Sequence, residues 1–311
     1  MAVLKIEDLH RILFVGAGTM GQQIAIQCAM HGYEAIIYDL SPKALETGRE
    51  RIEGYLAQLI SDKRLTDNDS GATLGRITLT SDPSQGAKAD LLSESIPEDP
   101  DLKARVFAQF NTICPPHTIF TTNTSTLLPS MFANATGRPG QFAAFHFHQY
   151  VWHSNLVDIM PHPGTSPETV QLLESFARRI GQVPLVLKKE HPGYVANAIL
   201  GAINETALNL VFRDEVASVE DVDRAVMIVL KLAMGPFAGL DVVGLDVIWH
   251  IAQTNANLSG DPNMQAKADR LKRDYIDKGW LGVKTGRGFY TYPDPAYARP
   301  DFLTGGATRQ S

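Results

Sequence analysis

The chain has 311 residues, of which 44% are apolar and 20% charged, and its formal net charge is −6. This length and composition are ordinary for a globular protein with one large domain or two smaller ones. The acidic balance, without a basic stripe, argues against nucleic acid as a partner, and no apolar run approaches the roughly 18 residues that a membrane span needs.

The two cysteines and the N-terminus indicate a cellular location. Cys28 and Cys114 lie in apolar surroundings without a pairing pattern, which favours reduced thiols. The N-terminus lacks a basic region followed by an apolar one, so it does not resemble a signal peptide. We therefore expect a cytoplasmic protein.

The first predicted unit is a strand, a glycine-rich turn and a helix. The apolar run 12–15 predicts a buried parallel strand, and Gly16-Ala17-Gly18-Thr19-Met20-Gly21 follows it at once. Apolar residues then recur at helical spacing until Gly32, a C-terminal cap. The next strand, 34–38, ends at Asp39.

This unit has the features of a dinucleotide site. Gly16 permits the tight turn, Gly18 lets the backbone approach a pyrophosphate, and Gly21 allows close packing of helix and strand. The helix N-terminus, at Thr19 and Met20, offers N–H groups to the phosphates. Asp39 is placed to accept the ribose hydroxyls and would repel a 2′-phosphate, which favours NAD over NADP. A glycine-rich turn without a ligand would leave Asp39 unexplained.

Strands and helices continue to alternate up to about residue 190. Helices are predicted at 42–63, 102–113 and 166–181, with a polar loop at 66–71. Strands are predicted at 77–80, 90–95, 118–122, 141–147, 156–160 and 183–187. This alternation predicts an α/β fold with an open, doubly wound, mostly parallel sheet. Ligands of such sheets bind at the carboxyl ends of strands, where Asp39, Glu94 and the turn 123–125 are expected.

Beyond the boundary candidate His191-Pro192-Gly193 the pattern is helical. Helices are predicted at 194–212, 218–232, 245–256 and 262–278, with a break at 234–237. The tail after Tyr292 is rich in Pro, Gly and polar residues and is expected to be loosely held. We predict a dinucleotide-binding domain at 1–190 and an all-helical domain at 191–311.

Histidines are concentrated at the end of the strand 141–147. His146 and His148 alternate along it and so share one face, where two imidazoles could bind a metal. Zinc would need further ligands, for which His153 and Asp158 are available. The alternative, which we favour, is that His146 acts as a base in nicotinamide chemistry, which needs no metal. His148, His153 and His162 are then interpreted as loop or strand-surface residues.

The order of six motifs is similar to that in 3-hydroxyacyl-CoA dehydrogenases, over nearly the whole chain. They are the glycine motif 16–21, Asn123-Thr124-Ser125, Pro192-Gly193-Tyr194-Val195-Ala196-Asn197, Met234-Gly235-Pro236-Phe237, Asp241-Val242-Val243-Gly244-Leu245-Asp246 and Lys284-Thr285-Gly286-Arg287-Gly288-Phe289-Tyr290. The resemblance implies a Rossmann-type domain, a helical C-terminal domain that dimerises and helps to form the substrate site, and NAD-linked oxidation of a 3-hydroxyacyl-CoA or the reverse reduction.

The resemblance also implies roles for single residues. His146 matches the histidine of the family motif His-Phe-Phe-Asn-Pro, and Asp158 stands twelve positions later, where the family has glutamate. Ser125 and Asn197 match the active-site serine and asparagine. The cofactor contact positions are matched by Glu94, Lys103, Asn123 and Lys284.

The chain departs from the family in the histidine motif. Phe-Phe-Asn-Pro is replaced by Phe147-His148-Gln149-Tyr150, and the segment 161–165 resembles the lambda-crystallin and L-gulonate dehydrogenase branch. One alternative is therefore a dehydrogenase of a small free 3-hydroxy acid such as L-gulonate. The other is a non-catalytic dinucleotide-binding protein in which the altered motif marks lost chemistry.

The reaction needs a base for the hydroxyl proton. Imidazole, with a pKa of about 6.5, suits a general base near neutral pH. A carboxylate on its other nitrogen fixes the tautomer and stabilises the imidazolium. Twelve residues with a turn between two strands can bring His146 and Asp158 together, and Ser125 and Asn197 would hydrogen-bond the substrate oxygen. Ser125 and Asn197 could instead be structural, as a turn cap and a core amide, and Lys103 and Glu98 a solvated pair.

Overall fold

The structure is a computed structural model that describes residues 4–305. It divides into two compact units, the first ending at Val195 and the second beginning at Ala196. The boundary predicted between residues 190 and 191 lies five residues earlier (195 − 190 = 5). Within residues 4–305, none of the helices combines the length and the apolar character needed to cross a membrane.

The first unit is built on an eight-stranded sheet with strand order β3-β2-β1-β4-β5-β6-β7-β8. The strands are β1 (Arg11–Val15), β2 (Glu34–Tyr38), β3 (Ile77–Thr80), β4 (Leu91–Glu94), β5 (Ile119–Thr122), β6 (Phe142–Phe147), β7 (Leu156–Pro161) and β8 (Val183–Val186). The pairs are parallel except β6 with β7, so β7 and β8 run against the other six strands. The predicted mostly parallel sheet is confirmed.

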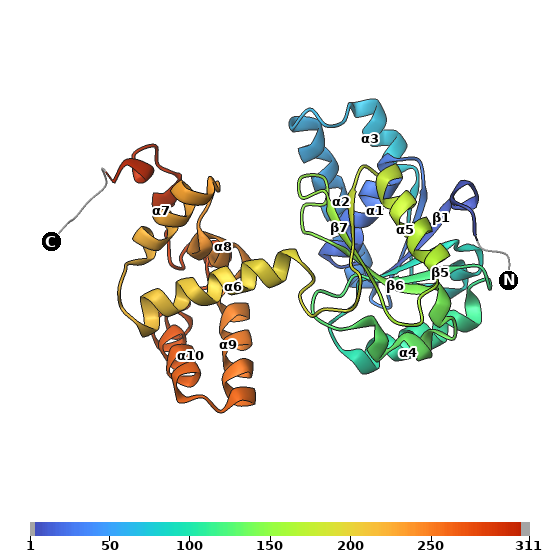
Figure 1. The fold of residues 1–311 in the computed structure, drawn as a ribbon. Helices are drawn as coiled ribbons and strands as arrows, with labels where there is room; N and C mark the ends of the chain where they lie inside the picture. Colours follow the sequence, from blue (N-terminus) through green and yellow to red (C-terminus); the bar gives the residue numbers. More distant parts are fainter. Residues whose placement is uncertain (1–3, 306–311) are drawn as a thin grey trace. The chain divides into compact units, whose positions relative to one another are not determined.

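Helices cover both faces of this sheet (Figure 1). They are α1 (Thr19–Met30), α2 (Pro42–Ser61), α3 (Asp67–Leu74), α4 (Pro100–Ile113) and α5 (Pro167–Arg179). Ile12 and Phe14 of β1 pack in one core cluster with residues of α1, α2 and α5, whereas Leu13 and Val15 pack in another with α4. Because alternate side chains of a strand point to opposite faces, β1 has to be apolar throughout.

The strand order reverses beside β1, which has β2 on one side and β4 on the other. The chain leaves β1 at Gly16 and leaves β4 at Ser95. In open α/β sheets the crevice outside the carboxyl ends of strands at such a reversal is where ligands bind. The topology therefore places the ligand site at the glycine motif.

The polar loop predicted at 66–71 is wrong, because α3 occupies most of it. Thr66 caps this helix, its Oγ1 accepting the N–H of Asp69 while the Asp69 carboxylate accepts the N–H of Thr66. This reciprocal capping box satisfies two groups that would otherwise be unpaired at the helix start. The Thr-x-x-Asp spacing indicates the start of a helix, but the prediction of a loop gave more weight to the polar composition of the segment.

The second unit is helical, as predicted. Its helices are α6 (Ala196–Leu208), α7 (Val219–Leu230), α8 (Pro236–Val243), α9 (Leu245–Ser259) and α10 (Pro262–Asp274). The helical run does break between α7 and α8, but α8 begins within the predicted break 234–237, with Gly235 as N-cap and Pro236 as first helical residue. Proline is favoured there because its missing N–H would have no partner in the helix.

Two buried carboxylates hold the turns of the second unit. Asp223 accepts the N–H groups of Phe237 and Ala238 at 2.8 and 3.0 Å, and Asp241 accepts those of Phe289 and Tyr290 at 2.9 Å each. Burial raises the pKa of both carboxyls, and these donors oppose that rise. The motifs 234–237, 241–246 and 284–290 therefore contain residues that pack the helical unit together.

The prediction of a loosely held tail is wrong for the part of it that the structure describes. Phe302 is only 1% exposed. The guanidinium of Arg224 lies over its ring at 4.7 Å, and Arg224 Nε donates to the Phe302 carbonyl at 2.7 Å. An aromatic anchor and a charged hydrogen bond thus hold a segment whose composition suggested disorder. Residues 306–311 lie outside the described residues.

Candidate active site

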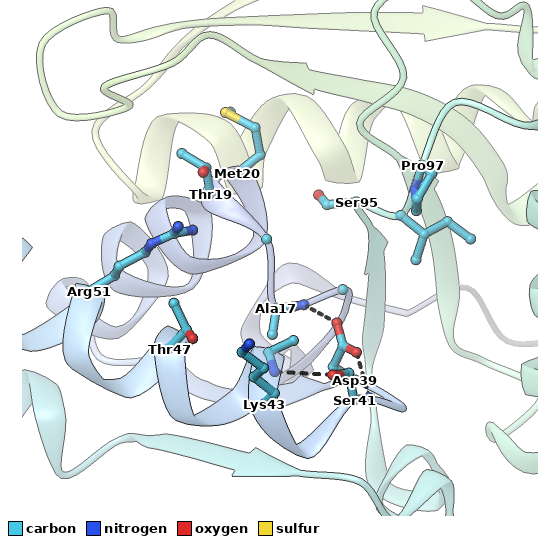
Figure 2. A pocket seen from close by; sticks show the side chains of 14 residues that line it. Ala17, Thr19, Met20, Asp39, Ser41, Lys43, Thr47, Arg51, Ser95 and Pro97 are labelled. Carbon is cyan, nitrogen blue, oxygen red and sulfur yellow. Dashed lines mark hydrogen bonds between the residues drawn. The ribbon is translucent and has the colours of Figure 1, made fainter. Parts of the chain in front are cut away.

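A cavity of about 690 Å³ opens at the point where the strand order reverses (Figure 2). Its walls are the glycine turn, the first residues of α1, the end of β2 and the segment after β4. The predicted contacts Gly16, Gly18, Thr19, Met20 and Asp39 all line it. The first turn of α1 places backbone N–H groups here, where the helix dipole favours an anion.

Glycine is needed at each of the three positions of the motif for a different structural reason. Gly16 has φ +111°, and a Cβ there would lie 2.6 Å from the carbonyl oxygen of Ser95. A Cβ on Gly18 would meet nothing within 4 Å and would project from a residue that lines the cavity. A Cβ on Gly21 would collide with the backbone carbonyl of Gly16. The backbone thus fits the turn, approach and packing roles predicted for these glycines.

Replacing Gly21 by alanine is expected to weaken NADH binding and to destabilise the protein by about 1–3 kcal/mol, the usual cost of overpacking. The reason is that the new methyl group can be accommodated only by moving α1 away from the glycine turn. NADH fluorescence titration and thermal unfolding would measure the two effects.

Gly54→Ala is the matched control, because Gly54 is an exposed glycine of α2 whose Cβ would meet nothing within 4 Å. It should leave NADH affinity unchanged and raise stability by about 0.5–1 kcal/mol. Equal effects of the two substitutions would contradict a specific role of Gly21 in packing.

Asp39 closes the cavity at the end of β2. Its carboxylate oxygens accept the N–H groups of Ala17 and Ser41, each at 2.9 Å, as Figure 2 shows. These bonds fix the carboxylate at the cavity wall and leave lone pairs for ribose hydroxyls. Lys43 and Arg51 also line the cavity, and neither is paired with a carboxylate among residues 4–305. Their charges suit the phosphates of a dinucleotide.

The second group of functional side chains lies at the carboxyl end of β6. His146 is directly opposite Asp158 in the antiparallel pairing of β6 with β7. Its Nδ1 lies 3.1 Å from Asp158 Oδ2. Both side chains are buried, and Asp158 is 0% exposed. Cross-strand neighbours of this kind have Cβ atoms about 5 Å apart, which is why the twelve-residue spacing brings the two groups into contact.

The carboxylate of Asp158 determines the tautomer of His146. Burial acts to raise the pKa of Asp158, but hydrogen bonds from His146 and His148 outweigh it and hold that pKa below its ordinary value. An ionised carboxylate only accepts hydrogen bonds, so His146 donates from Nδ1 and keeps a lone pair on Nε2. That nitrogen lies 3.1 Å from Ser125 Oγ. His146 Nε2 can therefore accept a proton on the side where the exposed Ser125 lies.

His148 lies just beyond the end of β6 and its side chain is 20% exposed, but it is not a free surface side chain. Its Nε2 lies 3.1 Å from the same oxygen, Asp158 Oδ2. The reason is that β6 ends at Phe147 while its alternation continues, so that His148 stays on the face of His146. His162 is also buried, its ring nitrogens contacting Pro139 O and Gly164 N. His153 turns away to Arg64 and Asp62 and does not join the other two histidines.

Tyr194 is a contact of His146 that was not predicted. Their rings stack at 4.5 Å with an interplanar angle of 11°, and the Tyr194 hydroxyl donates to the Thr124 carbonyl at 2.6 Å. Burial raises the pKa of this phenol, which keeps it a donor. Tyr194 thereby connects the histidine to the Ser125 turn. Tyr194 belongs to the motif 192–197, and this motif was the sequence signal that could have pointed to it.

The predicted cofactor contacts Glu94 and Lys103 form a buried ion pair. Their Oε1 and Nζ atoms are 2.6 Å apart, and the side chains are 0% and 1% exposed. Lys103 also approaches Glu98 Oε2 at 3.2 Å, so the solvated Lys103–Glu98 pair considered from sequence is wrong for Lys103. Burial raises the pKa of Glu94, and Lys103 opposes that rise. α4 carries Lys103 on its inner face, so its ammonium group points into the protein.

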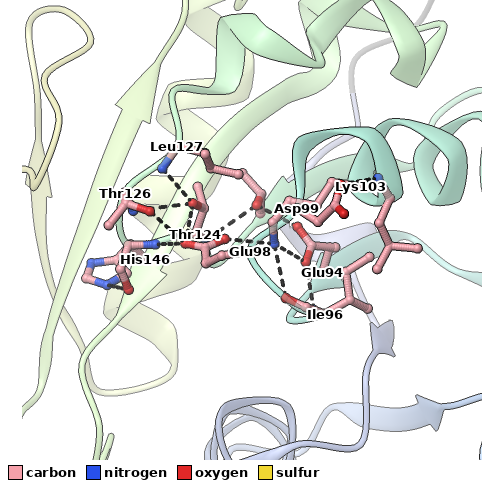
Figure 3. A network of polar contacts seen from close by, with 12 residues as sticks. Glu94, Ile96, Glu98, Asp99, Lys103, Thr124, Thr126, Leu127 and His146 are labelled. Atoms are coloured by element: carbon pink, nitrogen blue, oxygen red, sulfur yellow. Dashed lines mark hydrogen bonds and ion pairs between the residues drawn. The ribbon is translucent and has the colours of Figure 1, made fainter. Parts of the chain in front are cut away.

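Glu98 extends this pair to the turn that carries Ser125 (Figure 3). Its Oε1 accepts a hydrogen bond from the Thr124 hydroxyl at 2.6 Å and another from the N–H of Ser125 at 2.8 Å. Burial acts to raise the pKa of Glu98, but these bonds and Lys103 hold it below its ordinary range. Asn123 supports the turn as well, its Oδ1 accepting the N–H of Phe147 at 2.8 Å. The turn is thus fixed from both sides.

Two predicted site residues belong to the second unit. Asn197 is the second residue of α6 and is half-buried. Lys284 contacts both carboxylate oxygens of Asp246 at 2.6 Å. Their roles toward substrate and cofactor stay predictions.

The turn after His148 has a backbone conformation that the family motif, with its proline, could not adopt. Tyr150, at the position of the family proline, has φ +60°, and its N–H donates to Gln23 Oε1 at 2.6 Å. Proline has φ near −65° and no N–H, so it could do neither. Trp152 is buried beside Tyr55. A loop with proline at position 150 could therefore not follow the path that this loop takes.

Both units match models of one protein family. Residues 11–191 match the NAD-binding domain model of 3-hydroxyacyl-CoA dehydrogenase, and residues 193–292 match its C-terminal domain model. A probable 3-hydroxybutyryl-CoA dehydrogenase of Bacillus subtilis is 32% identical over 92% of this chain and 99% of its own.

Two solved structures are similar over most of the chain. A diketoreductase described as acting on dicarbonyl compounds has 38% identity and a TM-score of 0.84, covering 91% of this chain and 99% of its own. The (S)-3-hydroxybutyryl-CoA dehydrogenase of Ralstonia eutropha has 30% identity and a TM-score of 0.81, covering 92% and 100%.

Proposed function

The chain belongs to the 3-hydroxyacyl-CoA dehydrogenase family, and from this premise we propose that it interconverts a 3-hydroxyacyl-CoA and the 3-ketoacyl-CoA with NAD. The observation that supports this most directly is the arrangement around His146. Its Nε2 lone pair faces Ser125, and its Nδ1 is held by Asp158. The same unit carries the dinucleotide cavity.

In the proposed reaction, NAD supplies the acceptor for the hydride that leaves the substrate carbon. His146 removes the hydroxyl proton at Nε2, and Asp158 stabilises the imidazolium that results. The hydroxyl of Ser125 hydrogen-bonds the substrate oxygen as its charge changes. In the reductive direction His146 returns the proton from the same nitrogen.

The second unit would complete the enzyme. We propose that Asn197 hydrogen-bonds the substrate and that this unit forms a homodimer. Support for the dimer comes from large apolar side chains that are exposed on its helices: Ile199, Leu200, Val229, Leu230, Val243 and Ile251. Several large apolar side chains left exposed on one unit favour a surface that another chain covers.

A substrate without CoA is the second candidate. It is favoured by the 38% identity to a diketoreductase and by the altered segment at His148, Gln149 and Tyr150. In this case the same residues would oxidise a free 3-hydroxy acid such as L-gulonate or reduce a dicarbonyl compound.

A substrate panel distinguishes these candidates. NADH formation or consumption would be followed with 3-hydroxybutyryl-CoA, acetoacetyl-CoA, free 3-hydroxybutyrate, L-gulonate and a diketo ester. We expect kcat/KM for the CoA esters to exceed the others by at least about tenfold, equivalent to about 1.4 kcal/mol of transition-state binding. A preference for free acids or diketo esters would support the second candidate, and NADH binding without any turnover would support a non-catalytic binding protein.

A further inference from the structure

Three side chains at the end of β6 offer metal-binding atoms to one another. One ligand atom each of His146, His148 and Asp158 lies within 4.8 Å of the other two. Both imidazoles reach the same carboxylate oxygen, Oδ2, at 3.1 Å. The other oxygen, Oδ1, has no hydrogen-bond partner within residues 4–305 although Asp158 is 0% exposed. An unpaired buried carboxylate oxygen is costly, and a cation bound by both oxygens of the carboxylate would satisfy it.

The composition of this group selects the kind of ion. Two imidazole nitrogens and one carboxylate oxygen are the three protein ligands typical of an open zinc site. Magnesium and calcium prefer oxygen ligands, so the two imidazole nitrogens would be poor ligands for either ion.

The donor atoms need only a small movement to surround an ion. At metal–ligand distances of about 2.0–2.1 Å, tetrahedral ligand atoms lie roughly 3.3 Å apart. His146 and Asp158 are fixed by strand pairing, whereas the His148 side chain lies just beyond the strand end and is 20% exposed. His148 can therefore close the site, and it is also where an ion can enter.

We propose that His146, His148 and Asp158 form a binding site for one divalent transition-metal ion of the zinc type, and that its occupancy reversibly inhibits the dehydrogenase. The inhibition rests on the proposed function, because it requires His146 to be the base. The binding of the metal ion does not depend on that function.

The inhibition follows from the tautomer of His146. Without an ion, Nδ1 carries the proton and Nε2 the lone pair. An ion bound at Nδ1 takes that position, and the ring proton moves through solvent to Nε2. His148 likewise binds through Nε2 and carries its proton on Nδ1, so no net proton or electron is transferred. With a proton on Nε2, His146 donates to Ser125 and has no lone pair for the substrate hydroxyl.

The test compares the chelator-treated wild-type protein with His148→Phe. Calorimetric titration with ZnCl₂ and the visible absorption of bound Co²⁺ measure binding without substrate. We expect the wild type to bind one ion. His148→Phe should bind at least ~100-fold more weakly, since even an outer-shell partner is worth about 10–100-fold. Each protein's turnover would then be measured with and without Zn²⁺ as a ratio to its own uninhibited rate, and a chelator should restore the wild-type rate.

His153→Phe is the matched control. His153 is a nearby histidine that faces Asp62 and Arg64, so its loss should change neither ion binding nor inhibition. Absence of binding in the wild type, or equal binding by His148→Phe, would overturn the site, and binding that leaves turnover unchanged would overturn the inhibition. An ion bound through these residues in a protein without dehydrogenase activity would refute the proposed function and leave the site standing.

Discussion

Replacing His146 by alanine is expected to lower turnover by at least about 100-fold, the usual worth of a general base. The substitution removes the only ring whose Nδ1 is held by Asp158 while its Nε2 faces Ser125 in the described structure. NADH binding should persist, because His146 is not among the residues that line the dinucleotide cavity. Steady-state rates at saturating substrate and NADH fluorescence titration would measure the two quantities.

The control for this prediction is His162→Ala. His162 is also a buried histidine, but its ring nitrogens contact Pro139 O, which precedes β6, and Gly164 N, which follows β7. Its loss should affect stability more than the chemical step. If His146→Ala retained wild-type turnover while folded, the proposed mechanism would be wrong.

The largest expected effect on stability is that of Lys103→Met. It would leave the Glu94 carboxylate buried without its cation, and breaking a buried ion pair on one side typically costs about 3–5 kcal/mol. The Ser125 turn would lose support as well, because Lys103 also contacts Glu98, which holds that turn. Chemical denaturation would measure the change in the free energy of unfolding.

Two further variants test whether burial is the cause. Lys284→Met removes an equally short ion pair, 2.6 Å from Asp246, but the Lys284 side chain is 48% exposed. An exposed pair is worth at most about 1 kcal/mol, so this variant should be nearly neutral for stability. Glu94→Gln combined with Lys103→Met should be more stable than Lys103→Met alone, since the fully buried Glu94 position then carries no charge without a cation. Similar losses in Lys103→Met and Lys284→Met would contradict this explanation.

The dinucleotide-binding half could be predicted from sequence because its signals are local. A strand, the glycine motif, the first turn of a helix and Asp39 all lie within residues 11–39, and each has its own steric or electrostatic reason. The contact of His146 with Asp158 was also expected, because the resemblance places a carboxylate twelve positions after the histidine and a turn between two strands can bring such residues together. The polar helix α3 and the start of α8 were missed where composition was weighed above capping residues.

By itself, then, the sequence determined the doubly wound sheet and the helical second unit, and it singled out the glycine motif, Asp39, His146 and Asp158 as candidate site residues. Only the tertiary structure decided that His148 shares Asp158 with His146, that Tyr194 stacks on His146, and that Glu98 connects Lys103 to the Ser125 turn. These contacts join residues from different elements, and they depend on loop paths and side-chain directions. The periodicity of a sequence predicts on which face of its own helix or strand a side chain lies. It does not predict which residues of other elements pack against that side chain.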